Sequence, residues 1–187
     1  MRVIGGQLRG RRLRAPPGRD TRPTSDRVRE ALFSSLSDRV VGARVLDLFA
    51  GSGALGIEAL SRGADLAVLV EADRRTAGVL QDNLRQLGLE DHASLSVTTA
   101  EQFCLQPHPA PFEVVLLDPP YRTPQPALVS LLADLNDAGG LAADAAIVIE
   151  RDRRDPDLDA PLPPFLARDR LRQYGDTVLL YLRGAKA

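Results

Sequence analysis

Residues 45–149 alternate between short apolar runs and amphipathic stretches, and this alternation constrains the fold more than any other feature of the chain. Apolar runs predict strands, and hydrophobic residues spaced three and four apart predict helices. The predicted strands are residues 45–49, 66–70, 94–98, 114–117 and 147–149. The predicted helices are residues 54–61, residues 74–87 and a segment that carries Leu128, Leu131, Leu132 and Leu135. This order favours an α/β fold with a mostly parallel, doubly wound sheet covered by helices on both faces.

The C-terminal end departs from the alternation. Residues 171–174 and 178–182 flank the dipeptide Gly175-Asp176, a pattern that predicts an antiparallel hairpin at one edge of the sheet. The charged, proline-containing stretch 151–164 that precedes the hairpin is expected to be an exposed loop.

Basic charge is concentrated at the N-terminal end. Residues 1–40 hold ten arginines and four acidic residues, a net charge of +6, which leaves −7 for the rest of a chain whose total is −1. Because arginine suits bidentate contact with phosphate, we expect a basic extension over residues 1–40 and a main domain over residues 41–187. A solvated, arginine-rich tail is the alternative interpretation.

Within this extension, the apolar spacing that follows residue 25 predicts a helix. Thr24 or Ser25 can cap its N-terminus. The predicted buried face comprises Val28, Leu32, Phe33 and Leu36. Arg27, Arg29 and Glu30 fall outside this apolar face, so they are expected to lie away from the core.

Composition excludes several classes of protein. With 187 residues and 44% hydrophobic content, the chain suits one compact domain with an appendage. No apolar stretch approaches membrane-spanning length, so we expect a cytoplasmic protein with no membrane partner. Cys104 is the only cysteine, and His92 and His108 lack companions at ligand spacing. We therefore expect no disulfide and no metal, with Cys104 a small core residue.

A glycine-rich loop follows the first predicted strand of the main domain. Gly51, Gly53 and Gly56 form a G-x-G-x-x-G pattern, and Glu71 at the end of the next strand can hold ribose hydroxyls. The pattern alone fits either a nicotinamide cofactor or S-adenosylmethionine. Asp47 favours S-adenosylmethionine, because its carboxylate would repel a pyrophosphate and attract an ammonium group.

The segment Asp118-Pro119-Pro120-Tyr121 follows the strand 114–117 and predicts methylation of an amino group. The Asp118 carboxylate and the Pro119 carbonyl are two rigid acceptors for the N–H bonds of an exocyclic amine. Tyr121 offers a flat surface for a base. In a doubly wound sheet the loops that carry Asp47, Glu71 and Asp118 all leave the same edge, so donor and acceptor would meet there.

These motifs resemble those of the RsmD-type 16S rRNA guanine-N2 methyltransferases. The resemblance rests on the following segments: Arg2-Val3-Ile4-Gly5-Gly6, Arg9-Gly10-Arg11, Thr21-Arg22-Pro23-Thr24, Asp26-Arg27-Val28-Arg29-Glu30, Leu46-Asp47-Leu48-Phe49-Ala50-Gly51-Ser52-Gly53, Val70-Glu71, Asp118-Pro119-Pro120-Tyr121 and Tyr174-Gly175-Asp176-Thr177. It implies a Rossmann-like class I fold and methyl transfer from S-adenosylmethionine to N2 of a guanine in 16S rRNA of the small ribosomal subunit.

The resemblance also extends the predicted site. Phe49, Gly51, Ser52, Gly53 and Ala100 would join Asp47 and Glu71 around the cofactor. Family members often carry an Asp-Ala pair where this chain has Thr99-Ala100, so the adenine contact could come from backbone or from Glu101. The extension would bind RNA phosphates through Arg9, Arg11, Arg12 and Arg22, and the protein would act as a monomer.

Two alternatives stay open on the sequence alone. The same acceptor pair would suit an adenine-N6 or cytosine-N4 nucleic-acid methyltransferase, because any ring amine presents similar N–H bonds. A ribosome-assembly factor that binds rRNA without catalysis is the second alternative. The intact Asp118-Pro119-Pro120-Tyr121 segment argues against that second alternative.

Overall fold

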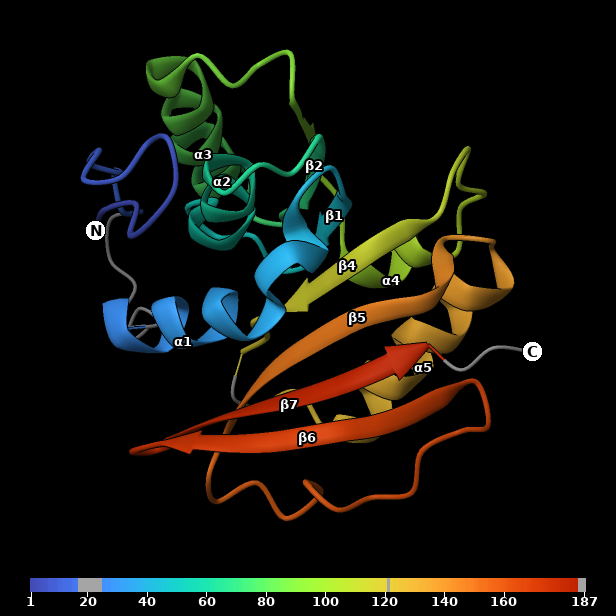
Figure 1. The fold of residues 1–187 in the computed structure, drawn as a ribbon. Coiled ribbons are helices and arrows are strands. Elements are labelled where there is room, and N and C mark those ends of the chain that lie inside the picture. The colour runs from blue at the N-terminus through green and yellow to red at the C-terminus, as the bar shows by residue number, and fades with distance from the viewer. Residues whose placement is uncertain (17–24, 121, 185–187) are drawn as a thin grey trace.

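The computed structural model describes residues 1–16, 25–120 and 122–184, and shows a seven-stranded sheet between two layers of helices (Figure 1). The strands are β1 Arg44–Asp47, β2 Leu66–Val70, β3 Ala93–Ser96, β4 Phe112–Leu117, β5 Leu141–Asp152, β6 Leu166–Tyr174 and β7 Thr177–Gly184. The helices are α1 Asp26–Leu36, the 3-10 turn η1 Ser37–Val40, α2 Ala54–Ser61, α3 Arg74–Leu87, α4 Ala100–Cys104 and α5 Gln125–Asp137.

The strand order is β3-β2-β1-β4-β5-β7-β6. The first five strands in this order run parallel, whereas β7 pairs antiparallel with both β5 and β6. The predicted doubly wound sheet and the C-terminal hairpin are therefore confirmed. The order reverses at the pair β1 and β4, so the connections from these two strands leave in opposite directions.

Helices cover both faces of the sheet and bury two hydrophobic clusters. On one face α1, α2 and α3 pack on the sheet, for example through Leu32, Ile57 and Leu80. On the other face α4 and α5 pack on it, for example through Phe103 and Leu132. Burial on both faces explains why the central strands are apolar at nearly every position. Cys104 belongs to the second cluster and is fully buried, as predicted.

The segment 151–164 differs from the exposed loop that the sequence predicted. Strand β5 continues to Asp152, because its pairing with β7 extends to the contact between Asp152 and Thr177. Arg151 is buried and forms an ion pair with the buried carboxylate of Asp155. Leu162 packs against the second cluster. Charge and proline content indicated exposure, but strand pairing and an internal ion pair bury part of the segment.

Residues 1–16, here called the arm, fold back on themselves and dock on the helices. The Val3 N–H donates to the Arg11 carbonyl at 2.9 Å, and the Gly10 N–H donates to the Val3 carbonyl at 2.9 Å. Val3 and Leu13 are buried in the first hydrophobic cluster. The arm is thus part of the packed structure as well as a carrier of charge.

One buried carboxylate fixes the arm to α2. Glu58 is fully buried and accepts hydrogen bonds from the Ile4 N–H at 2.7 Å and the Gly5 N–H at 2.8 Å. The Arg62 guanidinium, 2.8 Å away on the same helix, balances the charge. Ser61, one turn along α2, accepts from the Leu8 N–H at 2.9 Å.

Helix α1 begins at the predicted cap, but one of its arginines is not where the sequence indicated. The Ser25 hydroxyl accepts from the Val28 N–H at 3.3 Å, while Thr24 lies outside the described residues. Arg29 was expected away from the core and is instead fully buried. The arm covers it, and its Nη2 donates to the Arg2 carbonyl and to Asp26, both at 2.8 Å. Periodicity within a helix cannot report burial by a distant segment.

Replacement of Gly6 should detach the arm. Gly6 has a φ of +75°, and a Cβ there would lie 1.8 Å from the Ser61 carbonyl oxygen, which accepts the Gln7 N–H at 2.7 Å. We expect Gly6→Ala to lower the free energy of unfolding by about 2 kcal/mol or more, because backbone must move and hydrogen bonds are lost. Gly10→Ala is the matched control, since Gly10 has a φ of +83° but no atom within 4 Å. Equal denaturant midpoints for the two variants would contradict the docking role of Gly6.

Candidate active site at the carboxyl edge of the sheet

The sheet topology brings three predicted acids to one edge. Asp47 ends β1 and pairs with Leu69 of β2 and Leu116 of β4. Glu71 and Asp118 come directly after those two neighbouring strands, so all three acids lie at the carboxyl edge. This is also the point where the strand order reverses and the connections diverge, the usual position of a ligand crevice in such sheets.

Asp47 lies at the floor of this edge. It is 1% exposed, and its Oδ2 accepts the Gly56 N–H at 3.0 Å. Its Oδ1 is buried without a hydrogen-bond partner in the part of the chain that the structure describes. The pKa of Asp47 is raised to about 7, with burial as the largest cause; the nearby charges of Asp118 and Glu71 also raise it, and the backbone groups of Gly56 and Phe49 lower it. A cation beside Oδ1 would relieve this cost.

The glycine loop between β1 and α2 is tied to the neighbouring strand. The Ala50 N–H donates to the Val70 carbonyl at 2.9 Å, and the Gly53 N–H closes a turn on the Ala50 carbonyl at 2.7 Å. Gly56 allows α2 to pack closely on the sheet, because a Cβ there would lie 2.6 Å from Leu69 Cδ2. Phe49 is half-buried and packs against the second hydrophobic cluster.

Glu71 supports the loop through both of its oxygens. Oε2 accepts the Gly51 N–H at 2.9 Å, and Oε1 accepts the Asp73 N–H at 2.8 Å. The carboxylate is nearly buried, so these bonds fix its orientation. Each oxygen can accept one more hydrogen bond, which is compatible with the predicted contact to hydroxyl groups.

The remaining predicted residues fall at different points of the same edge. Asp118 is half-buried and Pro119 is buried at the end of β4, whereas Tyr121 lies outside the described residues. Ala100 is the buried first residue of α4, which Thr99 caps by accepting the Gln102 N–H at 3.2 Å. A backbone group and the exposed Glu101 thus both stay candidates for the contact with the adenine ring.

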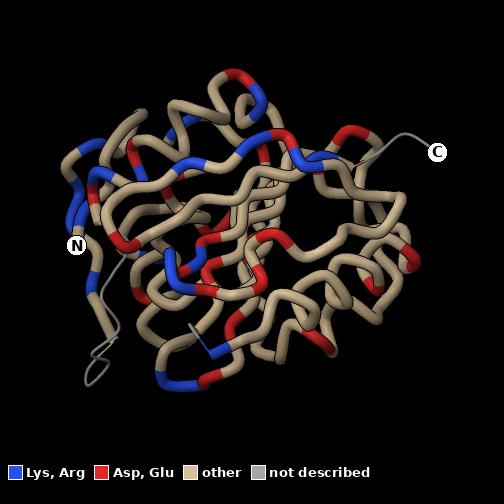
Figure 2. The backbone as a smooth tube through the Cα atoms, turned by 90° about the horizontal axis from the view of Figure 1, so that it is seen from below, with Lys and Arg blue, Asp and Glu red and all other residues tan. Residues whose placement is uncertain are grey.

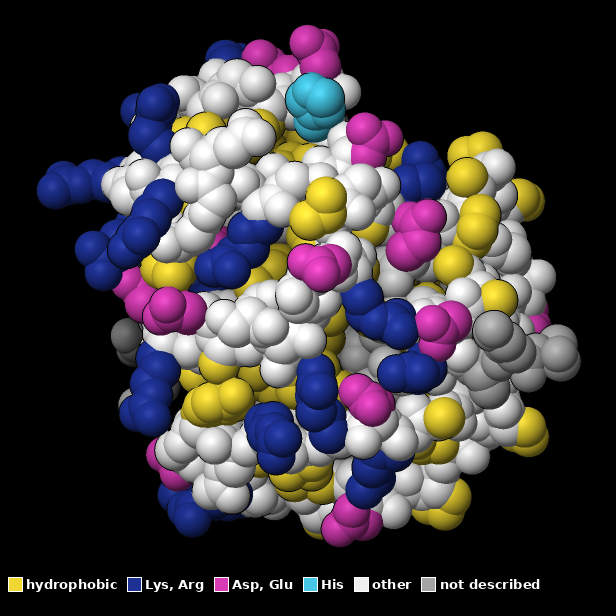
Figure 3. All heavy atoms as spheres, viewed as in Figure 1, with side chains coloured by type: hydrophobic (Ala, Val, Ile, Leu, Met, Phe, Trp, Pro, Cys, Tyr) yellow, Lys and Arg dark blue, Asp and Glu magenta, His cyan; other side chains and the backbone are white. Residues whose placement is uncertain are grey.

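The predicted phosphate-binding arginines lie on the outside of the arm. Arg9, Arg11 and Arg12 are exposed, while Arg22 lies outside the described residues. Lys and Arg positions gather along the N-terminal part of the chain (Figure 2), and their side chains project from the side of the molecule on which the arm lies (Figure 3). Two acids compensate other arm arginines, since Asp26 pairs with Arg2 at 3.0 Å and Asp82 pairs with Arg14 at 3.6 Å.

Two polar residues near the site were missed from the sequence. Glu58 anchors the arm, and Asn83 of α3 is 1% exposed and contacts both the arm and the glycine loop. The sequence contains an indication that Glu58 is unusual, because it is the only charged residue of the apolar stretch 54–61. Nothing in the sequence distinguishes Asn83, since a single asparagine on an amphipathic helix is ordinarily exposed.

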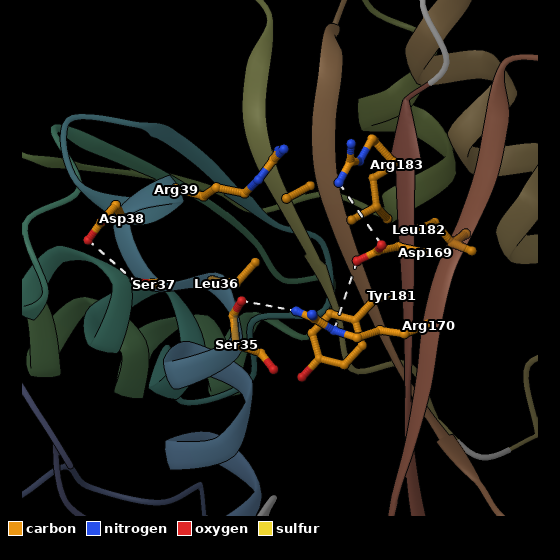
Figure 4. Close-up of a pocket in the computed structure, with 12 residues that line it drawn as sticks. Ser35, Leu36, Ser37, Asp38, Arg39, Asp169, Arg170, Tyr181, Leu182 and Arg183 are labelled. Atoms are coloured by element: carbon orange, nitrogen blue, oxygen red, sulfur yellow. Dashed lines mark hydrogen bonds and ion pairs between the residues drawn. The ribbon is translucent and has the colours of Figure 1, made fainter.

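A pocket of about 360 Å³ lies away from this edge, between α1, η1 and the strands β5, β7 and β6 (Figure 4). Its arginines make contacts within the protein. Arg39 pairs with Asp144 at 3.0 Å, and Arg170 donates to the Ser35 carbonyl at 3.0 Å while it stacks 4.7 Å from the ring centroid of Tyr181. These interactions connect η1 to β5 and α1 to the C-terminal hairpin.

No helix within residues 1–16, 25–120 and 122–184 has the length and hydropathy needed to cross a bilayer. The same ranges contain no group of three or more His, Cys, Asp or Glu residues arranged to hold a metal ion.

The raised pKa of the buried Asp47 carboxyl group predicts that the stability of the folded protein depends on pH. The pKa of Asp47 rises from 3.8 to about 7 on folding. The protonated carboxyl group therefore contributes its full stabilisation of the folded state below pH 4, and this stabilisation is lost as the pH rises to 7. Asp47→Asn removes this titration and keeps an oxygen that can accept the Gly56 N–H. We expect the variant without cofactor to be more stable than the unsubstituted protein at pH 8 by about 1 kcal/mol or more. Urea unfolding at pH 5 and pH 8 measures the difference, and parallel pH profiles would show that Asp47 titrates normally.

Comparisons with known proteins agree with this architecture. Residues 1–183 match the family described as Conserved hypothetical protein 95. Ribosomal RNA small subunit methyltransferase D of Escherichia coli is 45% identical over 150 residues, which cover 80% of this chain and 74% of that protein. YlbH of Bacillus subtilis is 41% identical over 155 residues, which cover 82% and 83% of the two chains. The solved structure of Escherichia coli yhhF has a TM-score of 0.85 at 37% identity and covers 100% of this chain and 99% of that one. The chain therefore belongs to the Conserved hypothetical protein 95 family, and its predicted RsmD-type methyltransferase relationship is confirmed.

Proposed function

We propose that this protein transfers a methyl group from S-adenosylmethionine to N2 of a guanine in 16S rRNA of the small ribosomal subunit. The observation that carries the proposal is the position of Asp118-Pro119 at the carboxyl end of β4, beside the strand that ends in Asp47 and the glycine loop. The name of the Escherichia coli relative supports the choice of small-subunit rRNA as substrate. Such a substrate implies a cytoplasmic enzyme.

The residues around the glycine loop fit the proposed cofactor. When bound, S-adenosylmethionine supplies an electrophilic methyl group on a sulfonium. The unpartnered Oδ1 of Asp47 suits the ammonium of a methionine moiety, and the Glu71 oxygens retain capacity to accept from ribose hydroxyls. Phe49, Gly51, Ser52 and Gly53 would line the same side, and Ala100 the adenine end.

The acceptor side is formed by the end of β4. The lone pair of a guanine N2 amine is delocalised into the ring, so the nitrogen is a poor nucleophile. Acceptance of its two N–H bonds by the Asp118 carboxylate and the Pro119 carbonyl would make the nitrogen pyramidal as the new N–C bond forms. The nitrogen must then lose one proton, and Asp118 is the nearest proposed base. Tyr121 would stack on the base, a contact worth about 1–3 kcal/mol.

The arm supports the choice of RNA. Arg9, Arg11 and Arg12 are exposed and would contact phosphates together with Arg22. A guanine in a loop is the favoured target, because a loop base can be extruded for only a few kcal/mol. In this proposal residues 1–40 form the RNA-recognition extension, residues 41–187 form the methyltransferase domain, and the protein acts as a monomer on an assembling small subunit.

Asp118→Ala should abolish most methyl transfer. Loss of a preorganised polar group that faces developing charge typically reduces the rate by about a hundredfold to a thousandfold. The test uses labelled S-adenosylmethionine and small subunits from cells that lack the enzyme. Asp137→Ala, a change of an exposed acid at the end of α5, is the matched control. Near-normal transfer by Asp118→Ala would exclude the assigned role.

The product nucleoside separates the proposed reaction from its alternatives. Digestion of the modified RNA followed by mass spectrometry should give N2-methylguanosine. N6-methyladenosine or N4-methylcytidine would identify a different ring amine as the target, and no methylation at all would favour a binding factor.

Removal of two arm arginines should flatten the salt dependence of RNA binding. Each lost phosphate contact reduces the slope of log K against log salt by about 0.7 to 0.9, so Arg9→Ala with Arg11→Ala should reduce it by about 1.4 to 1.8. A salt titration of binding to small-subunit RNA measures this slope. The double variant Arg153→Ala with Arg154→Ala makes the same charge change in the loop after β5. An unchanged slope in the arm variant would reject its phosphate contacts.

A further inference from the structure

A single side chain on α3 joins the arm to the glycine loop. Asn83 accepts the Arg14 N–H at its Oδ1 at 2.8 Å. Its Nδ2 donates to the Arg14 carbonyl at 3.0 Å and to the Ser52 carbonyl at 2.9 Å. The side chain is 1% exposed, so these three bonds are shielded from water. One planar amide therefore holds two segments that are far apart in the sequence.

The geometry makes the two segments depend on one another. Because both Nδ2 hydrogens and Oδ1 of Asn83 share one plane, a shift of the Ser52 carbonyl requires either a rotated amide or a matching shift of Arg14. A buried amide that loses its partners is unfavourable, so the matched shift is the cheaper response. The amide thus transmits a displacement in either direction.

A second contact reinforces this connection. The Ser52 hydroxyl lies 3.6 Å from the Met1 sulfur, and the Met1 carbonyl accepts the Leu13 N–H at 3.0 Å. Both ends of the arm therefore reach Ser52, one through Met1 and the other through Asn83. The other anchors of the arm, Glu58 and Ser61, bind its middle, where they accept hydrogen bonds from the backbone of residues 4, 5 and 8.

We propose that Asn83 is a positioning residue that couples cofactor binding at the glycine loop to RNA binding by the arm. The inference rests on the proposed function, because it assigns the cofactor to the loop and the RNA to the arm. Cofactor that orders residues 51–53 fixes the Ser52 carbonyl and through Asn83 holds Arg14, so the arm is preorganised for RNA. Linkage then requires that RNA increase the affinity for cofactor by the same factor.

The coupling can be measured as a ratio of affinities. The probe is the small subunit from cells that lack the enzyme, and its affinity is measured with and without saturating S-adenosylhomocysteine. For the unsubstituted protein we expect S-adenosylhomocysteine to tighten binding at least about fivefold, the lower end of typical coupling. In Asn83→Ala both ligands should still bind, and the ratio should fall below about twofold.

Ser61→Ala is the matched control. It removes the hydroxyl that accepts the Leu8 N–H and donates to the Gly5 carbonyl at 2.6 Å, and so weakens the arm at its middle. Its coupling ratio should stay near that of the unsubstituted protein. An equal loss of coupling in Ser61→Ala and Asn83→Ala would show that general loosening of the arm is sufficient, and would overturn the specific role of Asn83.

A second measurement needs no RNA. Hydrogen exchange at the Leu13 and Arg14 amides should slow when S-adenosylhomocysteine binds the unsubstituted protein, and Asn83→Asp, which loses both Nδ2 donors, should abolish that slowing. Cofactor binding without any slowing at these amides would overturn the inference. Failure of the unsubstituted protein to bind S-adenosylhomocysteine or small subunits would instead contradict the proposed function.

Discussion

The reversal of strand order between β1 and β4 is the constraint on which the rest of the structure depends. The connection from β1 crosses to one side of the sheet and the connection from β4 crosses to the other, so the two connections diverge at the carboxyl ends of these strands. Asp47 and Asp118 occupy those ends. A proposed donor site and a proposed acceptor site can therefore adjoin without any additional domain to bring them together.

Several carboxylates at one edge are electrostatically unfavourable, and Glu71 and Asp47 differ in how far the fold stabilises them. Both oxygens of Glu71 accept backbone N–H bonds, whereas Oδ1 of Asp47 is buried without a hydrogen-bond partner among the described residues and the pKa of Asp47 is raised. A group that is satisfied only in part by its own chain is typical of a binding site rather than of a structural core. The contrast between these two carboxylates supports a cationic ligand at Asp47 and a structural contribution from Glu71.

The basic arm is connected to the main fold by buried polar groups as well as by the exposed ion pairs of Arg2 and Arg14. Glu58, Arg29 and Asn83 each contact backbone atoms of the arm, and each is almost completely buried. Desolvated bonds of this kind fix position more strictly than exposed ion pairs do. The arm can thus present exposed arginines to a ligand while its backbone stays in register with the glycine loop.

The sequence by itself determined the parallel sheet, the hairpin, and the edge at which Asp47, Glu71 and Asp118 meet. These features follow from local periodicity and from the rule that parallel strands share one carboxyl edge. It did not reveal the burial of Arg29 and Arg151, the early start of β6 at Leu166, or the bridge made by Asn83. Only the tertiary structure decided these, because each depends on a segment distant in the chain. A pattern within one helix or strand records which face is apolar, and carries no information about which remote backbone will cover its polar side.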